Sequence, residues 1–179
     1  RTAIQFLSYE VPLLLAVLTP AVMAGSWSIR DIVIFQQEHP WAIAVQLVAL
    51  VVGLLALQAK LERVPFDAPE AETEIVAGPT TEYTGRRLAL FRLSTDVQML
   101  VGVALFSSIF LAGVTGPWYL AILLFLVKCI FLVCVLAVLK AMMARLRIQQ
   151  MRSFCWKYLV PIAIVQMAVI VLIKGGMGA

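Results

Sequence analysis

Residues 41–61, WAIAVQLVALVVGLLALQAKL, run directly into residues 62–78, ERVPFDAPEAETEIVAG. The first part is long enough to cross a bilayer as a helix, which takes about 20 mostly apolar residues. The second part is acidic: residues 62–82 hold six of the ten acidic residues of the chain and only one base, Arg63. We therefore expect a membrane helix that leads into an acidic loop, and a function in ion or proton handling or in docking a partner.

The composition predicts that most of the chain lies in a membrane. Of its 179 residues, 63% are apolar and 13% are charged, whereas soluble domains have about 45–50% and about 25%. We predict an all-α polytopic membrane protein that forms a single membrane domain over residues 1–179, surrounded by the lipid bilayer. Five apolar runs are long enough to span it: about 6–25, 41–61, 90–113, 118–140 and 154–173.

The basic residues predict the orientation of these helices. Eleven of the fourteen lie at the N-terminal end, in the loops 62–89 and 141–153, or at the helix ends beside these loops, whereas Arg30 and Lys174 lie on the other side and Lys128 lies inside the fourth run. Because cytoplasmic loops of membrane proteins carry an excess of Lys and Arg, the acidic loop 62–89 is expected in the cytoplasm. The same placement accounts for the net charge of +4 without a nucleic acid partner.

Polar and helix-breaking residues interrupt the apolar pattern. Segment 26–40 carries spaced apolar residues that predict a short interfacial helix. Glutamines within the runs predict interhelical hydrogen bonds: Gln46, Gln98 and Gln166.

Prolines in the first and fifth runs predict kinks or broken hydrogen bonds: Pro12, Pro20 and Pro161. The three cysteines lack the spacing of a metal site, so the chain itself is not expected to bind a metal.

The acidic loop contains residues that are typical of the beginning and the end of a helix. Asp67-Ala68-Pro69-Glu70 has the form of a capping box, with an acid in the place of Ser or Thr, and Gly78-Pro79 is suited to end a helix. The resulting helix, 68–77, would place Glu70 and Glu74 on one face, where like charges repel. If this face is turned toward the protein interior, at least one of the two carboxylates must have a raised pKa or a base must lie nearby. A raised carboxylate pKa is what a proton relay near neutral pH requires. The alternative is a solvated loop that only keeps the protein soluble.

Three ionisable residues lie within the apolar runs: Glu10, Asp96 and Lys128. Each costs a few kcal/mol at depth unless it is paired or hydrated, so each is a candidate functional residue. Lys128 lies about ten residues from either end of its run. Structural pairing with a carboxylate and participation in a proton relay are both open for it.

Several motifs resemble one known family. The run from Arg63 to Glu74, then Gly78 and Glu82-Tyr83-Thr84-Gly85, is similar to the signature loop of the H-type membrane subunit of respiratory complex I, a family that includes the matching subunit of complex I-like membrane-bound NiFe hydrogenases. Ser8-Tyr9-Glu10 and Ser153-Phe154-Cys155-Trp156-Lys157 also fit this family. The resemblance spans nearly the whole chain. It implies about eight helices, of which these five would be the last, in a prokaryotic cell membrane.

The resemblance implies a membrane subunit that joins the hydrophilic redox arm to the ion-pumping membrane arm. Iron–sulfur clusters, and a NiFe centre or quinone, would lie in or with partner subunits, and the redox arm would dock on loop 62–89. Two groups of residues would carry these roles. The proton relay would use Glu10, Glu70, Glu72, Glu74, Glu82, Asp96 and Lys128. Loop structure and docking would use Arg63, Pro65, Phe66, Asp67, Pro69, Gly78 and Tyr83.

Two departures from the quinone-reducing members favour the hydrogenase-like branch. Pro79 follows Gly78 where those members tend to have an aromatic residue, and Thr95-Asp96 stands where they tend to have Glu-Tyr. The first alternative is a subunit that frames a quinone chamber. The second is a secondary ion transporter, which would need a site at the membrane midplane and usually an internal repeat; Lys128 is the one strong midplane group and no repeat is visible. A passive membrane anchor is disfavoured by the ionisable residues at depth.

Overall fold

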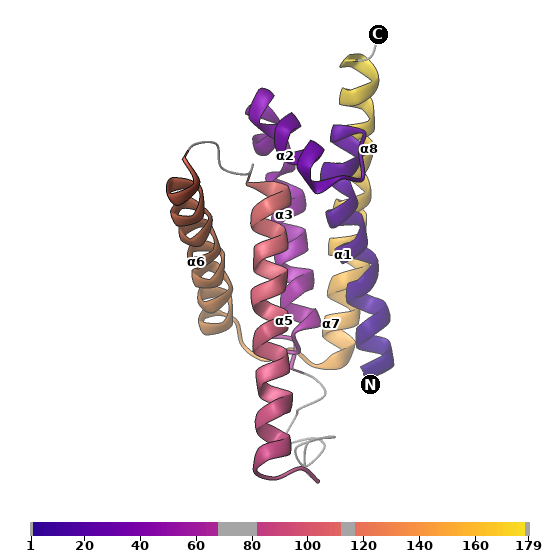
Figure 1. Ribbon diagram of the computed structural model, residues 1–179. Helices are drawn as coiled ribbons and strands as arrows, with labels where there is room; N and C mark the ends of the chain where they lie inside the picture. Colours follow the sequence, from indigo (N-terminus) through magenta and orange to yellow (C-terminus); the bar gives the residue numbers. More distant parts are fainter. Residues whose placement is uncertain (1, 68–81, 112–116, 178–179) are drawn as a thin grey trace.

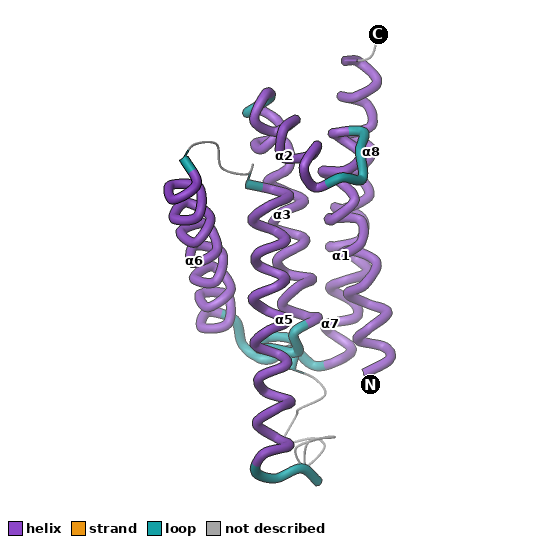
Figure 2. The backbone as a smooth tube through the Cα atoms, viewed as in Figure 1, coloured by secondary structure: helices purple, strands orange, loops and turns teal. Residues whose placement is uncertain are grey.

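The computed structural model describes residues 2–67, 82–111 and 117–177, which are helices joined by short connections, without strands (Figure 2). The helices lie in one bundle (Figure 1). Their bounds are α1 Thr2–Ala24, α2 Ile29–Glu38, α3 Trp41–Lys60, α5 Arg86–Phe110, α6 Trp118–Met142, α7 Ile148–Phe154 and α8 Val160–Met177, with a π-helical turn, η2, at Cys155–Leu159.

Five helices are long and apolar enough to cross a membrane: α1, α3, α5, α6 and the continuous helix formed by α7, η2 and α8. This confirms the predicted all-α polytopic fold, and the short helix predicted within 26–40 is α2. Three spans begin earlier than predicted: at Thr2 instead of residue 6, at Arg86 instead of residue 90 and at Ile148 instead of residue 154. The apolar run marks only the part of a helix suited to hydrocarbon, whereas backbone hydrogen bonding continues through polar turns such as Arg86-Arg87.

The helices form a bundle with distinct ends. α1 packs against α3 and α8, α3 packs also against α5, and α6 packs against α5 at the edge of the bundle (Figure 1). Residues 62–67 and the connection between α6 and α7, residues 143–147, lie at the same end as the N-terminus. We call this the loop end; α5 extends beyond the other helices there (Figure 1). α2 and the C-terminus lie at the opposite end.

Buried glutamines join the helices at the opposite end. Gln36 of α2 donates to Gln46 Oε1 of α3 at 2.8 Å and to the carbonyl of Ile109 of α5 at 2.6 Å. Gln166 of α8 donates to the carbonyl of Val45 at 2.5 Å. In an apolar interior such side chains bind other helices because an unpaired amide is costly. The interhelical hydrogen bonds predicted for Gln46 and Gln166 are confirmed.

The proline residues affect the helices unequally. Pro12 and Pro20 lie within α1, which is helical throughout. The hydrogen-bond pattern changes next to Pro161, where η2 ends two residues earlier, at Leu159. Proline has no N–H to donate, and a π turn is one way for a helix to accommodate that loss.

Close approach of α3 and α5 depends on a glycine. Phe106 of α5 is buried, stacks on Phe110 and lies directly over Gly53 of α3, where a Cβ would collide with the Phe106 ring. The Cβ of Ala16 in α1 is 3.3 Å from the same point. Small residues at such positions let membrane helices pack backbone against side chain.

We predict that Gly53→Val separates α1, α3 and α5 at this point. Overpacking of this kind costs about 1–3 kcal/mol, so the melting temperature of the purified assembly should fall. Gly175→Val is the matched control, because, apart from its chain neighbours and its own helix backbone, no atom of the described residues lies within 4 Å of its Cβ position. Equal melting temperatures for the two variants would show that the close approach is not required.

Candidate functional site

The acidic loop leaves the bundle through a fixed segment, residues 62–67, which we call the anchor segment. Helix α3 ends at Lys60 with backbone hydrogen bonds from Glu62 to Ala59 and from Arg63 to Gln58. Glu62 has φ +51°, the left-handed conformation that turns the chain out of the helix axis. The Phe66 N–H then donates to the Arg63 carbonyl at 2.8 Å, which closes a tight turn.

Two buried glutamines hold the anchor segment from the helices. Gln58 of α3 donates its amide N–H to the carbonyl of Val64 at 2.9 Å. Gln5 of α1 donates to the carbonyl of Phe66 at 2.9 Å and to the carbonyl of Ala59 at 3.1 Å. Each glutamine is 1% exposed, so these bonds are shielded from water. The first spanning helix and the loop that follows the second are thereby joined.

The connection between α6 and α7 holds the two remaining carbonyls. The N–H of Leu146 donates to the Pro65 carbonyl at 2.9 Å. Arg145 donates to the Asp67 carbonyl at 2.5 Å, and its Nη2 lies 3.4 Å from the Asp67 carboxylate. The four consecutive carbonyls of residues 64–67 therefore accept hydrogen bonds from three different parts of the chain.

Phe66 is the apolar part of this arrangement. Its side chain is 1% exposed and belongs to a buried cluster with Met151 and Cys155 from the last span. Its ring lies 6.4 Å from that of Phe154, centroid to centroid. Burial of a phenylalanine side chain contributes about 1.5–3 kcal/mol, so Phe66 anchors the loop on α7 and η2 as the hydrogen bonds do on α1 and α3.

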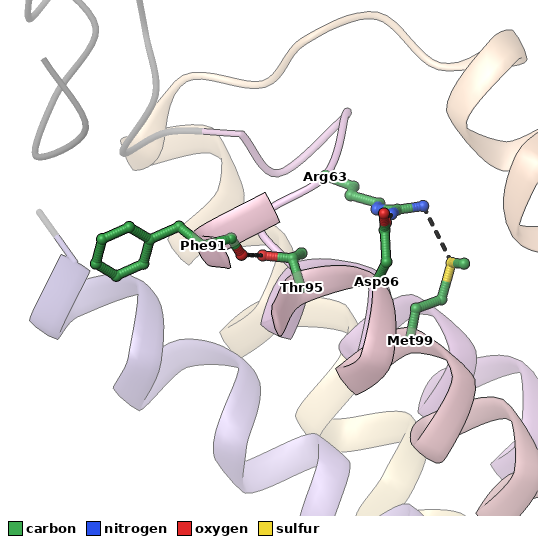
Figure 3. A network of polar contacts seen from close by, with 5 residues as sticks. All are labelled: Arg63, Phe91, Thr95, Asp96 and Met99. Atoms are coloured by element: carbon green, nitrogen blue, oxygen red, sulfur yellow. Dashed lines mark hydrogen bonds and ion pairs between the residues drawn. The ribbon is translucent and has the colours of Figure 1, made fainter. Parts of the chain in front are cut away.

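Arg63 turns to the other side, toward α5. Its guanidinium forms an ion pair with Asp96 and donates to Met99 Sδ at 3.0 Å (Figure 3). Thr95 donates to the Phe91 carbonyl of the preceding turn at 3.3 Å (Figure 3). The Asp96 side chain is 59% exposed in the chain, and exposed pairs contribute only about 0.2–1 kcal/mol. The ion pair therefore contributes little to stability, and its main effect is to orient the anchor segment toward α5.

Two other predicted relay residues are Glu10, within α1, and Glu82, before α5. Glu10 and Glu62, the first residue of the anchor segment, both lie near the phenol group of Tyr9. Glu82 is exposed before α5, and the Tyr83 ring packs against Phe91 at 5.1 Å. Glu70, Glu72, Glu74, Pro69 and Gly78 lie outside the described residues, as does the predicted helix 68–77.

Lys128 lies far from this group. Its Nζ donates at 2.7 Å to the carbonyl of Leu111, which caps the C-terminus of α5. A cation there complements the negative end of the helix dipole. The fifteen residues from Asp96 to Leu111 correspond to about 22 Å of helix. The structure thus brings Asp96 together with Arg63 and places Lys128 near the opposite end of α5.

Sequence reasoning missed the side chains that fix the anchor segment from outside: Gln5, Gln58 and Arg145. The sequence around each of them is not distinctive: Gln5 and Gln58 are amides near helix ends, and Arg145 is one of several basic residues in a loop. The available signal was that Gln5 and Gln58 lie within apolar helix ends beside the one loop with a dense motif.

A cavity of about 610 Å³ opens between α1, α3 and α5. Its lining is mostly apolar, with Lys60, Ser94 and Gln98 as polar groups. Among the described residues no group of three or more His, Cys, Asp or Glu side chains could hold a metal ion.

Five spanning helices and the hydrogen-bonded root of an acidic loop define a multi-pass helical membrane protein. The family model described as NADH dehydrogenase matches residues 1–171. The chain therefore belongs to the NADH dehydrogenase family of H-type membrane subunits, as its motifs predicted. The prediction of a multi-pass protein of a prokaryotic membrane is also confirmed.

Two relatives, each named as the H subunit of NADH-quinone oxidoreductase, illustrate the similarity. The one from Carboxydothermus hydrogenoformans is 37% identical, over 92% of this chain and 48% of the relative, and the one from Bacillus thuringiensis subsp. konkukian is 39% identical, over 97% and 53%. The chain thus spans about half the length of the curated relatives it matches. A solved structure of the membrane-bound sulfane sulfur reductase, an archaeal respiratory membrane complex, matches with TM-score 0.83 and 29% identity, over 94% of this chain and 57% of that one.

We predict that Arg145→Met loosens the anchor segment, because it removes the donor to Asp67 and the nearby positive charge. Amide hydrogen exchange of residues 62–67 in the purified assembly should speed up. Arg152→Met is the matched control, since Arg152 is an exposed base of the same end whose side chain forms no ion pair with another described residue. Equal exchange in both variants would show that Arg145 does not hold the segment.

Proposed function

We propose that this chain is the membrane subunit that connects the redox arm of a complex I-like complex to its ion-pumping membrane arm. The observation that carries the proposal is the anchor segment, whose four consecutive carbonyls are held by three parts of the chain. A loop needed only for solubility has no use for such fixed positioning. A loop that receives a mechanical or electrostatic signal needs a rigid root through which the signal reaches the helices.

The proposed mechanism begins with the redox subunits, which dock on loop 62–89 and shift it during turnover. Glu70, Glu72 and Glu74 change their hydration and pKa, and Glu82, Glu10 and Asp96 pass the change toward the membrane. Lys128 acts at the far end of α5. Its contact with the end of that helix means that a movement of α5 along its axis would change the surroundings of the lysine. Fe–S clusters and the catalytic centre belong to the partner subunits.

We predict that Glu72→Gln or Glu74→Gln, made in the whole complex, slows ion translocation at least roughly tenfold, which corresponds to about 1.4 kcal/mol on the limiting barrier. The measurement is ion uptake by vesicles that contain the purified complex, beside the rate of the redox reaction. Glu38→Gln, an exposed acid of α2 at the opposite end, is the control. Unchanged translocation in the loop variants would contradict the proposal.

Within this function we propose the membrane-bound hydrogenase branch. Thr95-Asp96 replaces the Glu-Tyr pair of quinone-reducing members, and Asp96 instead binds Arg63 of the anchor segment (Figure 3). Pro79 is the second departure. The matching solved structure, 29% identical, belongs to a complex named for sulfane sulfur reduction, whereas the two relatives of 37% and 39% identity are named for quinone reduction and support the alternative.

A quinone-chamber subunit is the alternative, and the cavity between α1, α3 and α5 favours it. A volume of about 610 Å³ is within the usual range of small-molecule sites, and an apolar lining with Lys60, Ser94 and Gln98 suits an amphiphilic ring. A quinone bound there would accept electrons and protons. This chain would supply only the walls and the polar groups that orient the ring.

An assay of the purified complex decides between the two branches. We expect hydrogen evolution with a nickel-containing large subunit among the partners. Quinone reduction that is sensitive to site inhibitors, and slowed by Leu57→Trp in the cavity wall, would favour the quinone chamber instead. Isolation of an active single chain without redox partners would support the secondary ion transporter.

A further inference from the structure

The C-terminal end of α5 is held by side chains from two other helices. The carbonyl of Ile109 accepts from Gln36 Nε2 of α2 at 2.6 Å, and the carbonyl of Leu111 accepts from Lys128 Nζ of α6 at 2.7 Å. The last carbonyls of a helix have no partner within it. Because a helix has 3.6 residues per turn, carbonyls two residues apart point to different sides. Helices α2 and α6 therefore hold the same helix end from different directions.

Gln36 is oriented in turn by Gln46 of α3, and we call these two residues the glutamine pair. Gln36 Nε2 also donates to Gln46 Oε1 at 2.8 Å, and Gln46 Nε2 donates to Met23 Sδ of α1 at 3.0 Å. Turning the Gln36 amide around would place its oxygen against the Ile109 carbonyl, and turning the Gln46 amide around would set two NH2 groups against each other. The hydrogen bonds of the glutamine pair therefore have one direction, which ends on α5.

The glutamine pair is shielded from water. Gln36 and Gln46 are each 1% exposed, and Ile109 is 3% exposed. Water cannot replace a hydrogen bond that is lost in such a place, so the carbonyl would stay unsatisfied. Lys128, in contrast, has a flexible four-carbon stem that can follow a carbonyl when it moves. The position of this helix end therefore depends on the glutamine pair more than on the lysine.

The other end of α5 is much less enclosed by the chain. Its buried residues all lie between Val103 and Phe110, whereas the side chains of residues 86–94, Leu88 excepted, are exposed. These first turns extend beyond the other helices at the loop end (Figure 1). A displacement that starts at the loop end therefore acts on a helix whose far end is fixed, and that far end binds Lys128.

We propose that Gln36 and Gln46 are positioning residues for Lys128: they fix the C-terminal end of α5, and so place the carbonyl that the lysine binds. The inference rests on the proposed function only for the part that Lys128 takes in ion translocation. In this arrangement neither glutamine carries a charge, and both act through the backbone of α5.

The direct test is a cryo-EM map of the whole complex with Gln36→Met, which keeps the length of the side chain without the amide. We expect the end of α5 to move and the Lys128 Nζ to leave hydrogen-bonding distance, about 2.7–3.2 Å, of the Leu111 carbonyl. Gln166→Met is the matched control, because Gln166 is also buried and donates to the carbonyl of Val45 at the same end of the bundle. An unchanged contact of Lys128 in Gln36→Met would overturn the proposal.

The functional test measures the ions moved per redox turnover by vesicles that contain these complexes. A merely structural defect lowers ion movement and the redox rate together, so it leaves this ratio unchanged. We expect Gln36→Met to lower the ratio roughly fivefold, the effect of one buried hydrogen bond, and Gln166→Met to leave it unaltered. An equal ratio in the two variants would contradict the positioning role.

A double-mutant cycle shows whether Gln36 acts through Lys128. If it does, adding Gln36→Met to Lys128→Met lowers the ratio no further than Lys128→Met alone, because residues that act through one another are not additive. Independent effects that multiply in the double variant would refute the inference.

Lys128→Met also separates failure of this inference from failure of the proposed function. If Lys128→Met lowers the ratio while Gln36→Met behaves like the control, the function stands and the positioning role fails. If Lys128→Met has no effect, the part of Lys128 in the proposed function fails, and the map alone decides whether the glutamine pair places the lysine. Should Gln36→Met not assemble, Gln46→Met removes the acceptor that orients Gln36, and the same results are expected from it.

Discussion

The hydrogen bonding of four consecutive carbonyls, residues 64–67, is the constraint on which the loop end depends. A backbone that leaves a membrane helix exposes polar groups that must find partners, because burying them unpaired costs several kcal/mol in hydrocarbon. Here α1, α3 and the connection between α6 and α7 supply the partners. Phe66 packs on α7 and η2, and Arg63 reaches α5. Each spanning helix or its end thus contributes to the place where one loop begins.

Apolar run length could predict the helices because a bilayer imposes one length and one polarity on every span. Trp41 and Trp118 were predicted as first residues and are the first residues of α3 and α6. Arg86 and Ile148 were missed, since helical backbone geometry does not require apolar side chains. The interhelical hydrogen bonds of Gln46 and Gln166 could be predicted because an amide buried in hydrocarbon is costly unless it binds a polar group of another helix.

The site was only partly predictable. Arg63, Phe66 and Asp67 were found because the loop motif is dense, but their partners lie 33 or more residues away in the sequence. No local sequence pattern indicates which amide or basic side chain will bind them. Gln5 and Arg145 gain their roles only from the tertiary arrangement. For Lys128, pairing with a carboxylate and a proton relay were both left open; its contact with the carbonyl of Leu111 at the end of α5 has no signature in the sequence.

The root of the loop also has an order of formation. Gln5 and Phe66 are 61 residues apart, and Asp67 must wait for Arg145, 78 residues later. During synthesis the acidic loop emerges before the connection between α6 and α7 exists, so its base stays open until the fourth and fifth spans are inserted. A hydrophilic partner that recognises the closed base would therefore bind only finished chains.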